Sequence, residues 1–432
     1  MRHMTLVMMT NTYLPFVGGV SNSVRTFADS LRARGHRVVV VAPGYGQQRD
    51  GDSAERDIVR VPSTRVFTKG PFAVSLAVQS ELVEQVRSIA PDLIHSHHPF
   101  LLGDTALRTA AALDVPLLFT YHTRYEHYTH YVRQNSTTMK RLAVEIATGY
   151  CNMVDCVIAP SESIRQLLVQ RGVERPLAVI PTGVDTAHFA AGDGEGFRRR
   201  YAIRDDAFVV GHVGRLAREK NCRLMAEAVL RFVRENPDTL FVLVGKGDER
   251  EAIETAFREA GLPHHLLPLG VLQGQDLVDA YHAMNAFLFA SRTETQGMVL
   301  AEAMAAGVPV VGLDAPGVRE VVQDRENGCL VAQETPDALA DGLAWIKQRL
   351  VEDTDELRSR CRTTAARFER EKSVDALEDL YLQWLRRHAE QASQPAALFP
   401  NLASRIEREW DIWSNRVAAI QALMKQENAS SR

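Results

Sequence analysis

The sequence has few cysteines and no long apolar run. It holds 5 cysteines in 432 residues, and their scattered positions lack the spacing of a metal site, so we read them as free thiols of a cytosolic protein. No stretch approaches the ~18–20 apolar residues of a membrane-spanning helix. The N-terminal apolar run, in MRHMTLVMMTNTYLP, is too short for a signal peptide and predicts a first strand.

An excess of one charge, internal repeats and low-complexity tracts are also missing. The formal net charge is only −4, although residues 1–190 carry 19 Lys and Arg against 16 Asp and Glu. We expect no nucleic-acid partner. The mildly basic first half is weak support for contact with an anionic surface such as lipid, and ordinary surface variation is the favoured explanation.

Short apolar runs alternate with helical patterns along the chain. Such alternation predicts βαβ units, and hence an α/β fold with parallel sheets and helices on both faces. The length allows two domains, and the polar segment 190–208 breaks the rhythm, so we predict domains at 1–190 and 205–372. Two such sheets leave a cleft between them, with ligands at the carboxyl ends of the strands. The predicted strands are MTLVMM, RVVVVAP, DLIHSHH, PLLFTYH, CVIAPS, LAVIPTG, FVVGHVGR, LFVLVGKG, HLLPLG, NAFLFAS and VPVVG.

The tail is predicted to be helical in two places. Residues 373–390 form one helix and residues 401–425 another, after the proline-containing break QPAALFP. The second has apolar residues at steps of three and four, which we expect to pack on the same chain. A membrane surface or a second subunit is the alternative partner. This stripe consists of Leu402, Ile406, Trp410, Trp413, Val417 and Ile420.

The stretch TETQGMVLAEAMAAGVPVVG, residues 293–312, carries two acids eight positions apart. It predicts a loop with Glu294, a helix over 298–306 with Glu302 one turn inside, and a buried strand. The start of a helix favours an anion, and Gly297 permits close approach to it. Two acids beside a phosphate fit a ligand with hydroxyls on both sides, as in a nucleotide sugar. The alternative is one solvated acid and one acid in the first helical turn, where it interacts favourably with the helix dipole.

Two further segments follow predicted strands in the second half. In VGHVGRLAREKN the strand ends at Gly214, and Arg215 and Lys220 then offer cations to phosphate oxygens. VGKGDERE, residues 244–251, resembles a dinucleotide fingerprint, but Arg250 occupies the position of its third glycine. The sequence therefore disfavours a dehydrogenase.

The first half offers two candidate positions. Gly18 and Gly19 lie between the first strand and a helix, where bare backbone amides can meet a phosphate or sugar. His122 ends the strand in FTYHTRY and is a candidate contact of a reacting sugar. The histidines of IHSHHPF, residues 94–100, lack an acidic partner at metal spacing, so we predict no metal site there.

These motifs together resemble the retaining glycosyltransferases of sequence family four, which have the GT-B fold. The matching segments are GGV at 18–20, His122, PTGVD at 181–185, GRLAREK at 214–220 and the Glu294–Glu302 pair. The resemblance implies two Rossmann-like domains facing across a cleft, an N-terminal one for the acceptor and a C-terminal one for the nucleotide sugar. It also implies that the helix near 373–390 crosses back to the N-terminal domain.

The resemblance also implies residue roles. Arg215 and Lys220 would bind the donor diphosphate, Glu294 would hold the sugar hydroxyls, and His122 would contact the sugar near the reacting carbon. No metal or other cofactor would be required, and the sugar would keep its anomeric configuration through same-face attack. The donor-binding set would be Gly18, Gly19, Gly214, Val271 beside the base, Gly297, Met298, Val299, and Glu302 on the ribose hydroxyls.

The acceptor is suggested by HTRYEHYTHY and TETQGMVLAEAM, which look like the subgroup that glucosylates diacylglycerol. We therefore expect a UDP-sugar donor, UDP-glucose above all, and a peripheral enzyme on the inner face of the cell membrane. RVFTKGPF at 65–72, Lys140 and Arg141 could contact lipid, and residues 401–425 could contact lipid or a second subunit. Alternatives are a soluble sugar, polyol or polysaccharide acceptor, a nucleotide-sugar epimerase, and a non-catalytic nucleotide-sugar binder.

Overall fold

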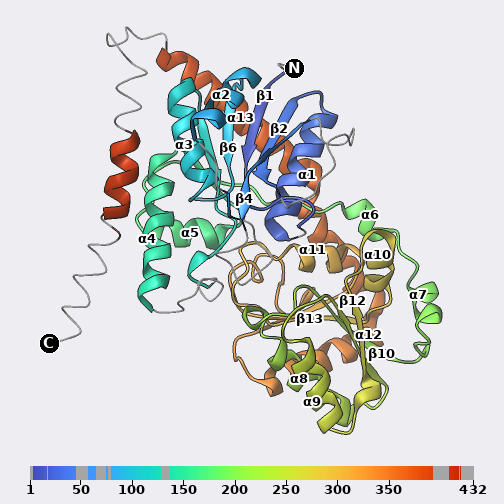
Figure 1. Ribbon diagram of the computed structural model, residues 1–432. Coiled ribbons are helices and arrows are strands. Elements are labelled where there is room, and N and C mark those ends of the chain that lie inside the picture. Colours follow the sequence, from blue (N-terminus) through green and yellow to red (C-terminus); the bar gives the residue numbers. More distant parts are fainter. Residues whose placement is uncertain are drawn as a thin grey trace, which may run out of the picture. The chain divides into compact units, whose positions relative to one another are not determined.

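The computed structural model describes residues 3–16, 18–44, 57–64, 74–75, 79–127, 137–392, 408–417 and 419. The chain divides into two compact units (Figure 1), one of Met1–Thr182 with Val374–Arg432 and the other of Gly183–Ser373. Each unit is built on a parallel sheet with helices packed on it, so the predicted α/β class is confirmed.

The first unit contains a seven-stranded parallel sheet in the order β3-β2-β1-β6-β7-β8-β9. Its strands are β1 Thr5–Met9, β2 Arg37–Pro43, β3 Ile58–Val61, β6 Leu93–Ser96, β7 Leu117–Thr120, β8 Cys156–Ala159 and β9 Leu177–Val179. A short antiparallel pair consists of β4 Ser63–Thr64 and β5 Val74–Ser75. The helices are α1 Gly19–Ala33, α2 Gln79–Ile89, α3 Leu102–Leu113, η2 Tyr125–His127, α4 Thr137–Met153, α5 Glu162–Gln170 and most of α13 Arg370–Ala392.

The second unit contains a six-stranded parallel sheet in the order β12-β11-β10-β13-β14-β15. Its strands are β10 Phe208–Val213, β11 Thr239–Val244, β12 Leu266–Gly270, β13 Ala286–Phe289, β14 Val310–Leu313 and β15 Gly328–Val331. The helices are α6 Thr186–Ala190, α7 Gly194–Arg200, η4 Arg218–Lys220, α8 Cys222–Glu235, α9 Arg250–Glu259, η5 Pro263–His265, α10 Gly274–His282, α11 Met298–Ala305, α12 Pro336–Ala365 and η6 Ala366–Phe368.

The order of strands reverses once in each sheet. The chain moves outward in one direction from β1 through β3, and then returns to the other side of β1 with β6. In the second sheet β10 and β13 hold the corresponding positions. Because ligands of doubly wound sheets bind outside the carboxyl ends of the strands at this reversal, the loops after β1, β6, β10 and β13 are the ones to inspect for a site.

The apolar runs are continuous because both faces of each sheet are covered. Along β1, Leu6 and Met8 pack in one buried cluster, whereas Val7 and Met9 pack in another on the opposite face. Successive side chains of a strand point to opposite faces, so a strand with helices on both sides needs apolar residues at every position. This is the pattern from which the sequence predicts parallel strands.

Helix α13 packs on the first unit. Val374, Leu377, Tyr381 and Leu385 recur along one face and are buried in the cluster that also holds Leu6 and Met8. The Tyr381 hydroxyl lies 2.7 Å from Nδ1 of His95, a fully buried residue of β6. The helix near 373–390 therefore joins the N-terminal Rossmann-like unit, as the resemblance implies.

The segment 190–208, predicted to connect the domains, belongs to the second unit. Phe197 of α7 is fully buried in its core. The guanidinium of Arg198 donates to the Ala283 carbonyl oxygen at 2.9 Å and to Oδ1 of Asn285 at 2.8 Å. The polar, glycine-containing composition of this segment suggests a linker. One buried aromatic ring and one arginine nevertheless attach it to the second unit.

The prediction that the apolar stripe of the tail packs on the same chain is wrong for its described members. Residues 408–417 are helical and lie beside α4 (Figure 1), but Trp410, Trp413 and Val417 are 73%, 61% and 47% exposed. The opposite face packs instead, through Ile412 at 1% exposure and Ala419 at 2%. Leu402, Ile406 and Ile420, and the basic stretch 65–72, lie outside the described residues.

Polar contacts attach this helix to the first unit. Arg416 and Glu409 form ion pairs with Asp104 and Arg108 of α3. Asn415 donates to the Ile146 carbonyl oxygen of α4 at 3.3 Å. The side of the helix opposite to Trp410 is thus fixed by charge pairs. Among the described helices, none combines the length and the apolar composition that crossing a membrane requires.

Candidate functional site

The loops after β10 and β13 meet at the strand reversal of the second sheet. Lys220, in η4 after β10, forms an ion pair with Glu294 in the loop after β13, and both side chains are largely buried. The hydroxyl of Ser291 donates to the Glu219 carbonyl oxygen at 3.3 Å and joins the same two loops. Arg215 forms an ion pair with Glu219 and keeps 37% of its side chain exposed. The structure therefore places two predicted cations and one predicted acid together.

Glycines of the 244–251 segment support this loop. A Cβ atom on Gly245 would lie 1.8 Å from the Gly214 carbonyl oxygen, and one on Gly247 would lie 2.0 Å from that of Leu216. The Leu216 amide donates to the Lys246 carbonyl oxygen at 2.9 Å. The glycines that resemble a dinucleotide fingerprint thus allow two strand-end loops to pack backbone against backbone, and they hold Arg215 in place.

The loop–helix–strand prediction for 293–312 is confirmed by α11 and β14. Gly297 precedes α11 with φ 69°, in the left-handed region that favours glycine. A Cβ atom there would also lie 2.7 Å from the Gly317 carbonyl oxygen. The first amides of a helix lack intrahelical acceptors, so Met298 and Val299 present N–H groups at the end that favours anions.

Glu302 lies one turn inside α11 and differs electrostatically from Glu294. The Tyr281 hydroxyl of α10 donates to its Oε2 at 2.8 Å. Burial raises the pKa of Glu302 to about 7, although the hydrogen bond from Tyr281 opposes this shift. Glu302 is therefore poised between its neutral and ionised forms near neutral pH, whereas Glu294 is paired with a cation.

The remaining predicted residue of the second unit, Val271, follows β12 and is 50% exposed. β12 lies two strands from β10 in the sheet order. The structure thus leaves Val271 at the carboxyl edge of the sheet, two strands away from the Lys220–Glu294 pair.

In the first unit, the predicted residues also follow strands near the reversal. Gly18 precedes α1, and Gly19 is its first residue. No described atom lies within 4 Å of a Cβ built on Gly19, so packing within the protein does not require glycine there. His122 follows β7, and its Nε2 lies 2.9 Å from Nδ1 of His97, which follows β6.

Two residues of these sites were not predicted. Tyr281 is 21 positions from Glu302, and no local pattern identifies it as a partner. His97 belongs to the HSHH motif, and no local pattern identifies His122 as its partner. Within the described ranges, no group of three or more His, Cys, Asp or Glu residues is placed to hold a metal ion.

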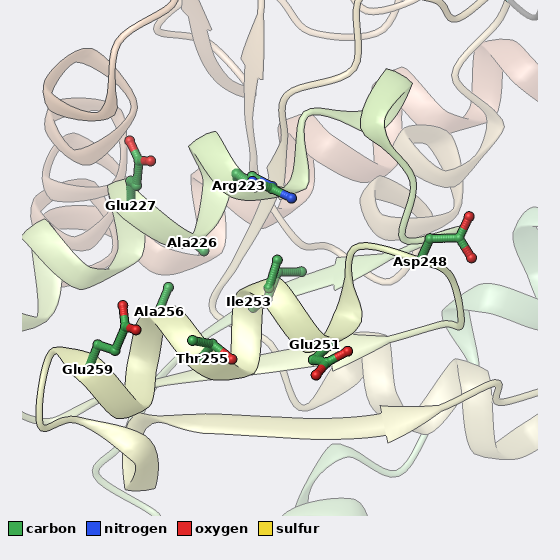
Figure 2. A pocket seen from close by; sticks show the side chains of 10 residues that line it. Arg223, Ala226, Glu227, Asp248, Glu251, Ile253, Thr255, Ala256 and Glu259 are labelled. Atoms are coloured by element: carbon green, nitrogen blue, oxygen red, sulfur yellow. The ribbon is translucent and has the colours of Figure 1, made fainter. Parts of the chain in front are cut away.

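A hollow of about 550 Å³ lies between α8 and α9 (Figure 2), and none of the predicted site residues lines it. Its charged lining consists of the acids Glu227, Asp248, Glu251 and Glu259 together with Arg223. The arginine is already paired with Glu249, 2.6 Å away. Carboxylates in excess would repel a diphosphate, so this hollow does not fit the predicted ligand.

Two family models together match most of the chain. Residues 17–188 match the description "Glycosyltransferase Family 4", and residues 193–368 match "Glycosyl transferases group 1". The chain is 32% identical over 346 residues to a GDP-mannose-dependent alpha-mannosyltransferase of Mycobacterium tuberculosis, covering 78% of this chain and 87% of that protein. It is 28% identical over 338 residues to the alpha-monoglucosyldiacylglycerol synthase of Acholeplasma laidlawii, covering 75% and 84%.

Solved structures agree on the fold. Anabaena HepE in complex with UDP superposes with a TM-score of 0.72 at 19% identity, covering 88% of this chain and all of that one. Sucrose-phosphate synthase of Thermosynechococcus elongatus gives 0.71 at 22%, covering 89% of this chain and all of that one. The protein therefore belongs to glycosyltransferase family 4 and has the GT-B fold.

Proposed function

We propose that this glycosyltransferase moves glucose from UDP-glucose, with retention of configuration, to a lipid acceptor such as diacylglycerol at a membrane surface. The observation that carries the proposal is the similarity to the A. laidlawii synthase, whose name states this sugar and this lipid. The acceptor-side motif HTRYEHYTHY and the residues around Glu294 support the same subgroup.

The Lys220–Glu294 pair suits a ligand that carries both phosphate and hydroxyl groups. Without a ligand each residue neutralises the other. A nucleotide sugar would offer phosphate oxygens to Lys220 and Arg215, and sugar hydroxyls to Glu294, so neither charge would be left unpaired when the donor binds. The amides of Met298 and Val299 would meet the diphosphate, which needs no metal ion when cations and a helix start surround it.

The other donor contacts are assigned by the resemblance. Glu302 would accept hydrogen bonds from the ribose hydroxyls, and the main chain at Val271 would meet the base. Gly18 and Gly19 would contact the phosphates, and Gly214 would leave room for the ligand at the end of β10. His122 would contact the sugar near the reacting carbon.

Mannosyl transfer from GDP-mannose is the second candidate. The M. tuberculosis relative uses that donor by name, and it shares the higher identity, 32%, over 78% of this chain. The two donors differ in the base and in the orientation of one hydroxyl on the sugar. Direct comparison of the two donors therefore separates these candidates.

The exposed face of residues 408–417 supports peripheral contact with a membrane. Trp410, Trp413 and Val417 point away from the first unit, together with Ser414, one turn after Trp410. The Arg416 guanidinium lies over the Trp413 ring, 6.0 Å from its centroid, and tryptophan is enriched where proteins meet the lipid interface. On the neighbouring α4 the exposed Lys140 and Arg141 are cations that suit anionic lipid. We propose contact with the inner face of the cell membrane through these residues.

The function is tested by release of nucleoside diphosphate from UDP-glucose, UDP-galactose and GDP-mannose, with and without diacylglycerol in mixed micelles. We expect lipid-dependent release of UDP from UDP-glucose, unchanged by a metal chelator, and a product with an α linkage. Release that requires a soluble sugar would overturn the lipid acceptor. Interconversion of the nucleotide sugars without an acceptor would identify an epimerase.

Glu294→Gln should lower turnover by about 100-fold, as expected when a charged contact to the reacting sugar is lost, while Glu254→Gln on α9 should not.

Binding of UDP-glucose should weaken as the pH falls through about 7. The ionised Glu302 carboxylate would accept hydrogen bonds from the two ribose hydroxyls, whereas the protonated form must first lose its proton. Because the pKa of Glu302 is about 7, the protonated form becomes the major one below that pH. The dissociation constant should therefore rise about tenfold between about pH 8 and about pH 6. Calorimetric titration without acceptor measures it. Glu302→Gln should bind weakly at both values, and an unaltered pH profile in that variant would assign the effect to another group.

The raised pKa of Glu302 also affects stability with a defined sign. The folded protein binds a proton here that the unfolded chain, with the ordinary value of 4.5, releases. The contribution of this group to stability is therefore full below about pH 4.5 and declines as the pH rises towards 7. An improvement in binding at higher pH consequently cannot arise from a more stable fold at this position.

Gly19→Ala should preserve the fold and impair donor binding. A methyl group at Gly19 meets no described atom within 4 Å, and alanine in the first turn of α1 favours the helix by about 0.5–1 kcal/mol. We expect an unchanged or higher melting temperature and a KM for the donor raised about tenfold or more by the displaced phosphate. Gly103→Ala is the steric comparison, since its Cβ would lie 2.0 Å from the His98 carbonyl oxygen; it should lower the melting temperature. Unchanged donor kinetics in Gly19→Ala would remove Gly19 from the site.

Replacement of Trp410 and Trp413 by serine should weaken binding to anionic vesicles tenfold or more, because each buried large apolar side chain contributes about 1.5–3 kcal/mol. Vesicle pelleting at low salt measures it. Val351→Ser, at a position 85% exposed in the second unit, is the control and should bind as the parent protein does. Failure of the parent protein to bind vesicles would overturn the proposed membrane contact. Loss of a dimer in the tryptophan variant would instead show that this face binds a second copy of the chain.

A further inference from the structure

His97 and His122 form a hydrogen-bonded pair at the carboxyl edge of the first sheet. They follow the neighbouring strands β6 and β7, which pair in parallel with Ser96 opposite Phe119. The His97 amide donates to the Met9 carbonyl oxygen at 2.9 Å and fixes the backbone. Nδ1 of His97 lies 2.9 Å from Nε2 of His122, and His97 is completely buried.

The neighbouring histidines have other partners. His95 lies between the Tyr381 hydroxyl and the Thr120 hydroxyl, at 2.7 Å from each. Nδ1 of His98 accepts from the Asn11 amide at 3.1 Å. These two rings attach the strand to α13 and to the loop after β1, so their roles are structural. The His97–His122 contact differs, because it joins two residues that follow adjacent, already paired strands.

Both rings of the pair are neutral at physiological pH. Burial lowers the pKa of His97 well below 6.5, and His95, His122 and His98 lower it further. Burial lowers the pKa of His122 in the same way, with His98 and His95 adding to the effect. Two neutral imidazoles share one proton in the hydrogen bond between them, so one ring donates and the other accepts.

The buried end of His97 decides which ring donates. Its Nε2 has no hydrogen-bond partner among the described residues. If His122 donated, the proton of His97 would lie on Nε2 as a buried N–H without an acceptor. If His97 donates, Nε2 keeps only a lone pair, and buried donors without partners are rarer in proteins than buried acceptors. Donation by His97 to Nε2 of His122 requires the proton of His122 to lie on Nδ1.

We propose that His97 is a positioning residue that keeps His122 as the neutral Nδ1–H form, so that His122 offers a hydrogen-bond donor to an oxygen atom of the donor sugar. This inference rests on the proposed function, in which His122 contacts that sugar. In this form His122 has no basic nitrogen to offer, because the lone pair of Nε2 is occupied by His97. His122 would therefore orient a hydroxyl or ring oxygen and would not remove a proton from the acceptor.

The tautomer is measured directly by ¹⁵N–¹H correlation spectra of the full-length protein labelled at histidine, with His122→Asn and His97→Asn used for assignment. We expect the protonated nitrogen of His122 to be Nδ1. In His97→Leu, which removes the donor, we expect the proton of His122 to move to Nε2. A proton on Nε2 in the parent protein, or an unchanged tautomer in His97→Leu, would overturn the inference.

Turnover separates positioning from packing. The amide of asparagine can donate from the position of Nδ1, so His97→Asn should keep both the tautomer and most of kcat. His97→Leu should lose about tenfold or more in kcat, with the KM for the acceptor unchanged. Equal losses in both variants would indicate packing alone. If the tautomers behave as expected but no nucleotide sugar is turned over by the parent protein, the proposed function fails and the positioning of His122 stands.

Discussion

Gly245 and Gly247 bring one strand-end loop so close to another that no side chain fits between them. Gly214 donates to the Val244 carbonyl oxygen, and Gly245 in turn donates to that of Gly270 at 2.6 Å. Backbone hydrogen bonds therefore join the ends of β10, β11 and β12. These hydrogen bonds and close approaches fix the backbone from which the charged side chains of this edge extend. Arg215 and Lys220 depend on this frame for their position.

The two acids in 293–312 show how one short segment produces two different carboxylates. Gly297 lets the chain turn sharply between them, so that Glu294 stays on a loop and Glu302 enters a helix. Lys220 is the partner of Glu294, whereas Glu302 has a buried hydroxyl as its partner. The first acid is thus ion-paired, whereas burial favours the neutral form of the second. Their difference arises from the surroundings and not from their spacing.

The sequence predicted the parallel strands wherever an apolar run was long and bounded by turn residues. It did not predict β3 and β15, which are edge strands: β3 contains Arg60 and is half-exposed, and β15 starts at Gly328. The prediction that the apolar stripe of the tail is buried failed because Trp410 and Trp413 have helical spacing, and this spacing is the same for a face in a core and a face in solvent. Periodicity gives the faces of a helix but not which face is covered.

Contacts between residues far apart in the sequence could not be predicted, for a related reason. Lys220 and Glu294 could be expected to lie near each other only because both were assigned to one ligand. Tyr281 with Glu302, and His97 with His122, are separated by 21 and 25 positions and meet only because of the order of strands and helices. That order follows from packing of the whole sheet, and no local pattern in the sequence contains it.

The assigned roles constrain where the proton of the acceptor goes in the proposed reaction. Glu294 is held by Lys220 and would bind sugar hydroxyls, and His122 would present an N–H group. Neither offers a base to the attacking hydroxyl. As the bond from the anomeric carbon to the diphosphate oxygen breaks, negative charge grows on that oxygen, which lies on the face from which a retaining attack comes. In the proposed reaction the bond to the acceptor oxygen would then form as its proton passes to the departing diphosphate, so that the leaving group itself would supply the base.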